Sequence, residues 1–157
     1  MTALTRIAPC LWYDGAAREA ADFYVSLFPE SSVDAVLPGQ DGKPLFVSFT
    51  LAGQRMQALN GGPGFPHSNA MSLSVACDTQ AEIDRLWTAL GADGGKELEC
   101  GWVTDRWGVP WQIVPSFLEA RISTGTPEQV GRMMVAVWSM KKLDLAAMQA
   151  AFDGEGS

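Results

Sequence analysis

The sequence predicts an α+β fold in which a β-α-β-β-β module occurs twice and is followed by a helical tail. Two observations carry this prediction. The same order of one strand, one helix and three strands can be traced on both sides of a Gly- and Pro-rich segment at residues 61–69. Around the final strand of both halves, a glycine is followed by three residues, a glutamine and two apolar residues. Such self-similarity indicates an internal repeat, with Gln57 and Gln112 at equivalent positions.

The first module is expected over residues 5–60. A β-like run at residues 7–13 precedes a helix at residues 16–28, in which apolar residues recur at helical spacing. Pro29 follows this helix and indicates its end. Turns that contain glycine then separate three short apolar runs, which are typical of strands. These strands are expected at residues 32–37, 45–51 and 55–60.

Residues 61–69 are expected to form a linker, and the second module is expected over residues 70–115. Its helix begins with a capping box, in which Thr79 is the N-cap and Glu82 stands three residues later. Gly91 indicates the end of this helix. The strands of the second module are expected at residues 71–77, 96–99, 102–105 and 111–114.

The tail, residues 116–157, is expected to be helical and lies outside the repeat. Thr126 and Gln129 form a second capping box. Asp144 is expected to cap a last helix, with Leu143 and Met148 as its hydrophobic staple. The apolar residues of the tail are rich in methionine, and they predict packing either on the protein's own sheet or on a partner subunit.

Composition excludes several classes of partner. The 157 residues include 11 basic and 18 acidic ones, and the basic residues form no cluster, so we expect no nucleic-acid binding. No apolar window is long enough to span a membrane, and we expect neither a membrane anchor nor a signal peptide. Cys10, Cys77 and Cys100 are odd in number and widely spaced, which favours a reducing cytoplasm over a disulfide framework.

Three motifs carry a resemblance to a known family: PCLWYDG at residues 9–15, ALNGGP at 58–63 and CGWVTDRWGVPWQIVP at 100–115. With the repeat, they resemble the PhnB-like, 3-demethylubiquinone 3-methyltransferase-like branch of the vicinal oxygen chelate superfamily. Glyoxalase I, extradiol dioxygenases and bleomycin-resistance proteins share that fold. The resemblance extends over about residues 5–152. It implies a single glyoxalase-like domain whose sheets curve around a cavity, in a bacterial-type cytoplasmic homodimer.

The resemblance also implies four positions at which metal-dependent relatives hold a divalent ion. The last-strand positions fall at or beside Gln57 and Gln112. The first-strand positions fall near residues 7–8 and 71–72. None of them carries a carboxylate or an imidazole, and neutral amides are poor ligands for a divalent metal. We therefore expect no metal cofactor, and a divalent ion is the disfavoured alternative. His67 is expected to be a solvated or turn residue of the linker rather than a ligand.

We expect the chain to bind a small molecule in a pocket of amide and aromatic groups, with no assigned catalytic residue. The alternative is an enzyme of glyoxalase or dioxygenase type, either metal-dependent or metal-free and then using Cys10 or Asp105. Asn60 is expected either to contact the ligand or to start the next turn. Asp105 and Arg106 are expected to form a structural pair rather than a catalytic one. Strand alternation places Trp111 on the face opposite Gln112, so we expect Trp111 in the core. The expected pocket residues are Gln57, Gln112, Asn60, Cys10 and Trp102.

The methyltransferase label of this branch has no support in the sequence. A nucleotide-fold methyltransferase needs a glycine-rich loop between a strand and a helix. The densest glycine segment, residues 60–64, contains a proline and precedes no expected helix. No binding of S-adenosylmethionine is expected.

Overall fold

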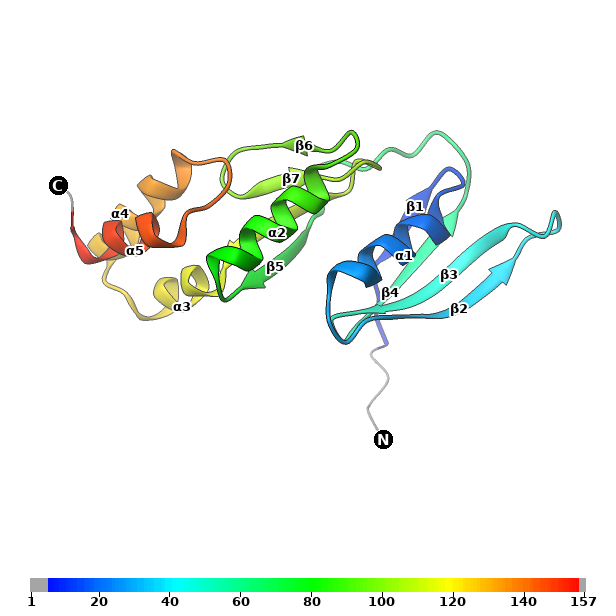
Figure 1. The fold of residues 1–157 in the computed structure, drawn as a ribbon, viewed down its shortest axis with the longest axis horizontal. Helices are drawn as coiled ribbons and strands as arrows, with labels where there is room; N and C mark the ends of the chain where they lie inside the picture. Colours follow the sequence, from blue (N-terminus) through cyan, green and yellow to red (C-terminus); the bar gives the residue numbers. More distant parts are fainter. Residues whose placement is uncertain (1–5, 156–157) are drawn as a thin grey trace. The chain divides into compact units, whose positions relative to one another are not determined.

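The structure, a computed structural model, describes residues 6–155. The chain divides into two compact units, the first ending at His67 and the second beginning at Ser68. Each unit contains one β-α-β-β-β module, and the second also contains the helical tail (Figure 1). The α+β class and the repeated order of elements are therefore confirmed.

The sheet of the first unit has four strands in the order β1-β4-β3-β2. The edge strand β1 runs parallel to β4, and the other neighbours are antiparallel. Helix α1 covers one face of this sheet (Figure 1). The elements are β1 (Cys10–Tyr13), α1 (Ala17–Leu27), β2 (Ser32–Pro38), β3 (Pro44–Leu51) and β4 (Gln54–Asn60).

The core of the first unit lies between α1 and the sheet. The helix buries Ala17, Ala20, Ala21 and Tyr24, which follow the predicted helical spacing. Burial alternates along the strands, so one face of the sheet packs against the helix and the other face does not. The strand residues of this core include Leu11, Tyr13, Val47, Phe49, Leu51, Met56 and Ala58.

The sheet of the second unit repeats this topology, with the order β5-β8-β7-β6 and parallel pairing of β5 with β8. Helix α2 packs on it through Ile83, Leu86, Trp87 and Leu90, as its spacing predicts. The elements are β5 (Leu73–Cys77), α2 (Gln80–Gly91), β6 (Lys96–Glu97), β7 (Trp102–Thr104) and β8 (Pro110–Pro115).

The start of α2 differs in one detail from the predicted capping box. The hydroxyl of Thr79 accepts the Glu82 N–H at 3.2 Å, as predicted. The Glu82 carboxylate, however, accepts the N–H of Asp78 at 3.0 Å rather than that of Thr79. Gly91 is the last residue of the helix rather than the residue after it.

The tail forms three helices: α3 (Ser116–Thr124), α4 (Pro127–Trp138) and α5 (Leu145–Asp153). The capping box at Thr126 and the cap at Asp144 are both confirmed. The tail has its own buried cluster, so its methionines pack within the second unit. The cluster consists of Met133, Val137, Leu143, Met148 and Phe152, which includes both residues of the expected staple.

Most element boundaries agree with the sequence prediction. The first strand is shorter than expected, because residues 7–9 precede β1, and β6 contains only Lys96 and Glu97. Within residues 6–155, no helix is both long and apolar enough to traverse a bilayer.

Candidate ligand site

Gln57 lies in the middle of a row that crosses the first sheet. On one side, its parallel neighbour on β1 is Cys10. On the other side, its antiparallel neighbour on β3 is Ser48. The flanking residues Met56 and Ala58 are buried under α1, so the Gln57 side chain lies on the face without a helix.

Gln112 occupies the equivalent place in the second sheet. Its parallel neighbour on β5 is Ser74, and its antiparallel neighbour on β7 is Trp102. Trp111 and Ile113 are buried, so Gln112 also lies on the face without a helix, and the prediction that Trp111 is a core residue is confirmed. The structure thus pairs Cys10 with Gln57, and Trp102 with Gln112, each pair within one unit.

The two amides differ in their hydrogen bonds. The Gln112 side chain donates from Nε2 to the Ser72 hydroxyl at 2.9 Å. No hydrogen bond of the Gln57 side chain occurs among the residues that the structure describes. A primary amide offers both donors and an acceptor, which suits hydrogen bonding to a polar group.

Cys10 is an exposed thiol beside Gln57. Partial desolvation nevertheless raises its pKa above the ordinary thiol value. A raised pKa keeps the sulfur protonated at neutral pH, and the thiolate is the nucleophilic form. Cys10 is therefore better suited to contact a ligand than to attack one.

The donor set around the two glutamines does not fit a divalent metal. It consists of amides, hydroxyls and one protonated thiol, with no carboxylate or imidazole in either row. Among residues 6–155, no three His, Cys, Asp or Glu side chains are grouped so that they could hold an ion. Hard divalent ions prefer charged oxygen ligands, and softer ones prefer imidazole or thiolate.

Asn60 lies on the opposite face of the sheet from Gln57. Its Oδ1 accepts the N–H of Ala17 at 2.9 Å, and its Nδ2 donates to the Pro44 carbonyl at 2.8 Å. It therefore caps helix α1, which has no side-chain cap of its own. The structure does not bring Asn60 together with Gln57. It instead lines a crevice of about 290 Å³ with Gly15, Gly39, Asp41, Lys43, Pro44 and Leu45.

Asp105 has a structural role. It is only 2% exposed, and its Oδ1 accepts the N–H groups of Trp107 and Val109, both at 3.0 Å. Its Oδ2 accepts the indole N–H of Trp111 at 3.0 Å. Arg106 makes its ion pair with Asp93, at 2.8 Å. These contacts hold the turn between β7 and β8, and they leave Asp105 poorly placed to accept a proton from a substrate.

The segment after β4 folds back onto β1, a feature that the sequence analysis missed. The Trp12 indole donates to the Gly62 carbonyl at 2.8 Å, and its ring meets Phe65 edge-on at 5.0 Å. The His67 Nε2 lies 2.7 Å from the Trp12 carbonyl oxygen, so this nitrogen carries the proton of the hydrogen bond. His67 is therefore an anchor of the segment rather than a solvated residue. The signal in the sequence was Gly61, where a Cβ atom would overlap the indole ring of Trp12.

The fold is also found among solved structures of distant proteins. A genomically encoded fosfomycin resistance protein from Listeria monocytogenes, solved with Mn(II) and sulfate, is similar with a TM-score of 0.52 at 13% identity. That match covers 78% of this chain and 98% of the Listeria chain. At this identity, the similarity concerns the fold alone.

Nearer matches identify the family. A PhnB protein from Bacillus cereus is 30% identical with a TM-score of 0.67, over 71% of this chain and all of that one. A protein from Pseudomonas aeruginosa is 25% identical with a TM-score of 0.57, over 68% of this chain and 94% of that one. The family model of 3-demethylubiquinone-9 3-methyltransferase matches residues 5–114. The chain belongs to this family, to which the PhnB-like resemblance in its sequence also points.

The family match ends immediately before the tail. The resemblance expected over residues 5–152 therefore extends, in this match, over the two modules only. A search of curated proteins found none that matches the chain.

Proposed function

We propose that this protein binds a small organic molecule and works without the divalent metal of its superfamily. The observation that carries the proposal is the equivalent placement of Gln57 and Gln112, each in the centre of a helix-free sheet face. The resemblance implies that relatives place metal ligands at these positions. Amides there provide hydrogen bonds to a polar group of a ligand and provide no charge to hold an ion.

Methyl transfer is not the activity that the geometry supports. In both units the strand-to-helix connection is short, residues 14–16 before α1 and residues 78–79 before α2. Neither connection is the glycine-rich loop that would wrap a nucleotide-like cofactor. The family description therefore does not by itself assign S-adenosylmethionine chemistry to this chain.

An enzyme of glyoxalase or dioxygenase type is the alternative. The metal-free version loses support because Asp105 is buried in structural hydrogen bonds and the Cys10 thiol has a raised pKa. The metal-dependent version would require ligands other than the two glutamines. We further propose that the protein is a homodimer in the cytoplasm, as the family resemblance implies.

Two measurements test the proposed function. Purified protein, prepared without chelators, is expected to contain far less than one divalent ion per chain by elemental analysis. Native mass spectrometry is expected to show a small organic molecule retained by the wild type and lost from the Gln57→Ala, Gln112→Ala double variant. One tightly held ion per chain, or a ligand retained equally by the double variant, would overturn the proposal.

A further inference from the structure

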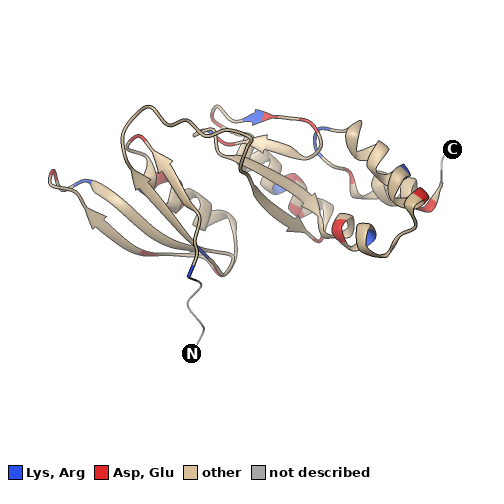
Figure 2. Ribbon diagram, turned by 180° about the vertical axis from the view of Figure 1, so that it is seen from behind, with Lys and Arg blue, Asp and Glu red and all other residues tan. Residues whose placement is uncertain are grey.

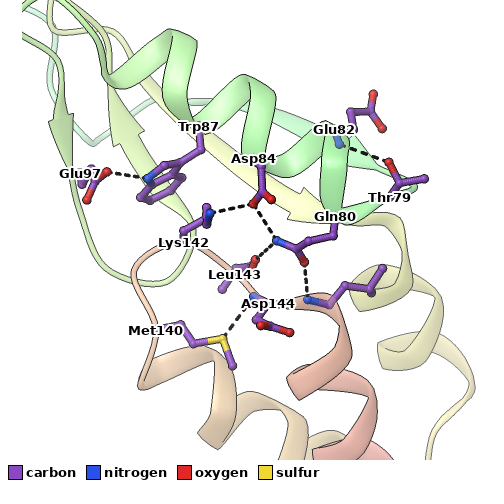
Figure 3. A network of polar contacts seen from close by, with 11 residues as sticks. Thr79, Gln80, Glu82, Asp84, Trp87, Glu97, Met140, Lys142, Leu143 and Asp144 are labelled. Carbon is purple, nitrogen blue, oxygen red and sulfur yellow. Dashed lines mark hydrogen bonds and ion pairs between the residues drawn. The ribbon is translucent and has the colours of Figure 1, made fainter.

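The tail, which lies outside the family match, is fastened to the second unit by the loop that follows α4 (Figure 3). The Gln80 side chain donates to the Leu143 carbonyl at 3.1 Å and accepts the Leu145 N–H at 2.8 Å. Lys142 forms an ion pair of 2.7 Å with Asp84. These contacts hold the loop after α4 on the second unit.

Helix α4 buries one face and exposes an apolar face on the opposite side. Met133 and Val137 are buried in the cluster of the tail, against which Val114 of β8 also packs. Val135 and Trp138, by contrast, are 62% and 64% exposed. They are neighbours on the helix surface, because residues three apart lie on the same side of a helix. The packing of a single chain does not account for this outer face.

Gly131 lies on the same outer face, one turn before Val135. A Cβ atom at Gly131 would meet nothing within 4 Å, so there is room beside it for a side chain from outside. The outer face therefore combines a large projecting ring at Trp138 with an open position at Gly131. A tryptophan that fits an open place on a partner is typical of the residues that dominate interface energies.

The two ends of this face carry opposite charges. Glu128 lies in the first turn of α4, Lys141 follows its last residue, and both are exposed. Neither takes part in an ion pair among residues 6–155. The Lys141 backbone is held in place, because its carbonyl accepts the Gly101 N–H at 2.7 Å. Between the two charges, Arg132 is the one charged residue of α4, and most of the helix is uncharged (Figure 2).

We propose that two copies of the chain associate through α4, with the two helices antiparallel about a twofold axis beside Val135. This axis brings Trp138 of each copy against Gly131 of the other, because both lie about one turn from Val135. It also brings Glu128 towards Lys141, about two turns away on either side. Antiparallel helices place opposite dipole ends together as well. The inference rests on the proposed homodimer, whose contact surface it names, and is independent of the ligand.

The size of α4 sets the strength of this association. The 12 residues of the helix extend over about 18 Å, so one pair of helices buries less area than a standard protein interface. We expect a dissociation constant in the micromolar range. In dilute protein, as used for unfolding experiments, the chain is then a monomer and the position beside Gly131 is open.

A membrane surface is the other partner that an exposed tryptophan close to lysines could suit. The chain has a net charge of −7, and Glu128 stands on the same face as Trp138. Both features disfavour contact with anionic headgroups. A second copy, in contrast, provides the opposite charge at each end of the face.

The first test is sedimentation velocity of the full chain over a dilution series. Wild type is expected to show a monomer–dimer equilibrium. Val135→Asp places two carboxylates beside the twofold axis and should weaken the dimer by about 100-fold or more. The matched control is Ile122→Asp, which places the same charge at a 53% exposed aliphatic position on α3 and should leave the dissociation constant unchanged.

The second test exchanges the charges at the two ends. Glu128→Lys and Lys141→Glu each create like charges at both ends of the dimer, and each is expected to weaken association about tenfold. An equimolar mixture of the two variants should associate at least as tightly as wild type, because every introduced charge then faces its opposite. Both changes are at exposed positions, and circular dichroism checks that both variants fold.

Other outcomes overturn the inference in distinguishable ways. A dimer that persists unchanged in Val135→Asp would show that another surface joins the copies. A monomer at every concentration would overturn the inference together with the proposed homodimer. Failure of the mixed variants to associate would contradict the antiparallel arrangement. Binding to vesicles of phosphatidylcholine and phosphatidylserine, lost in Val135→Asp and without a dimer, would identify a membrane partner instead. Metal content and native mass spectrometry decide the proposed ligand binding separately.

Discussion

Gly61 lies against the indole ring of Trp12 so closely that a Cβ atom there would overlap ring atoms Cζ2, Cη2 and Cε2. The ring cannot retreat without breaking its hydrogen bond to Gly62. Because glycine has only a hydrogen atom in place of a side chain, Gly61 allows the segment after β4 to fold back onto β1. Here glycine is required for space and not for a left-handed backbone.

Gly61→Ala is expected to destabilise the protein by about 1–3 kcal/mol, the usual cost of overpacking. The measurement is urea denaturation followed by far-UV circular dichroism. Truncation of the ring in a Gly61→Ala, Trp12→Leu double variant should relieve the clash, so the two changes should be less than additive. An unchanged unfolding midpoint for Gly61→Ala would contradict the observed contact.

Asp105→Ala is expected to cost about 2–4 kcal/mol, because it leaves two backbone N–H groups and the Trp111 indole N–H without their acceptor. Asp93→Ala is the matched control. It removes an exposed partner of Arg106 and should cost about 0–1 kcal/mol. Thermal unfolding distinguishes the two variants. Similar small losses in both would show that the buried acceptor contributes little.

At the scale of single elements, helix α4 contains a glycine whose side-chain position is empty. A Cβ at Gly131 would meet nothing within 4 Å. Gly131→Ala is therefore expected to stabilise the protein by about 0.5–1 kcal/mol, since alanine loses less backbone freedom in a helix. The expected result is a higher unfolding midpoint in urea, opposite in sign to Gly61→Ala. A lower midpoint would show that position 131 is occupied in solution.

The junction between α2 and the loop before α5 is expected to respond to pH. The Asp84 pKa is lowered, first by its hydrogen bond with Lys142 and then by that with Gln80. Because the folded-state pKa lies below the unfolded value, the stabilisation is present at neutral pH and is lost as the pH falls through the folded pKa. The stability difference between wild type and Lys142→Met should therefore shrink under acid conditions. A difference that stayed constant with pH would exclude this ion pair as its source.

At the scale of the whole molecule, the three cysteines are expected to react in a fixed order with a thiol reagent. Cys10 is exposed, Cys100 is partly covered and Cys77 is buried. Burial also raises the pKa of Cys77 to about 12. At mildly alkaline pH, Cys10 should be labelled first and Cys77 only after denaturation. Mass spectrometry of digested protein gives the order, and early labelling of Cys77 would contradict the position of β5 under α2.

Much of the fold could be predicted from the sequence, because periodicity and caps act locally. The spacing of Ile83, Leu86 and Leu90 gave the inner face of α2, and Thr126 and Asp144 gave the starts of two tail helices. The equivalence of Gln57 and Gln112 followed from the repeat, whereas the pairing of Gln57 with Cys10 is seen only in the structure. Burial of Trp111 followed from strand alternation.

The roles of Asn60 and His67 could not be predicted in this way. Asn60 caps a helix that begins 43 residues earlier in the chain, and His67 binds a carbonyl 55 residues away. Such contacts depend on where the end of β4 lies relative to β1 and α1, which local propensity does not specify. The covering of Val114 by the tail depends on tertiary packing for the same reason.

The loop between α4 and α5 is held against the second module largely by hydrogen bonds of the loop's backbone. The Gln80 amide donates to the Leu143 carbonyl and accepts the N–H of Leu145. The N–H groups of Cys100 and Gly101, just before β7, donate to the carbonyls of Met140 and Lys141. Backbone N–H and C=O groups remain when a side chain is substituted. Apart from the buried Leu143, the ion-paired Lys142 and the capping Asp144, the loop sequence should therefore tolerate drift, while Gln80 and Gly101 carry the constraint. Transplanting this tail onto a related module would accordingly require changes in the receiving module rather than in the tail.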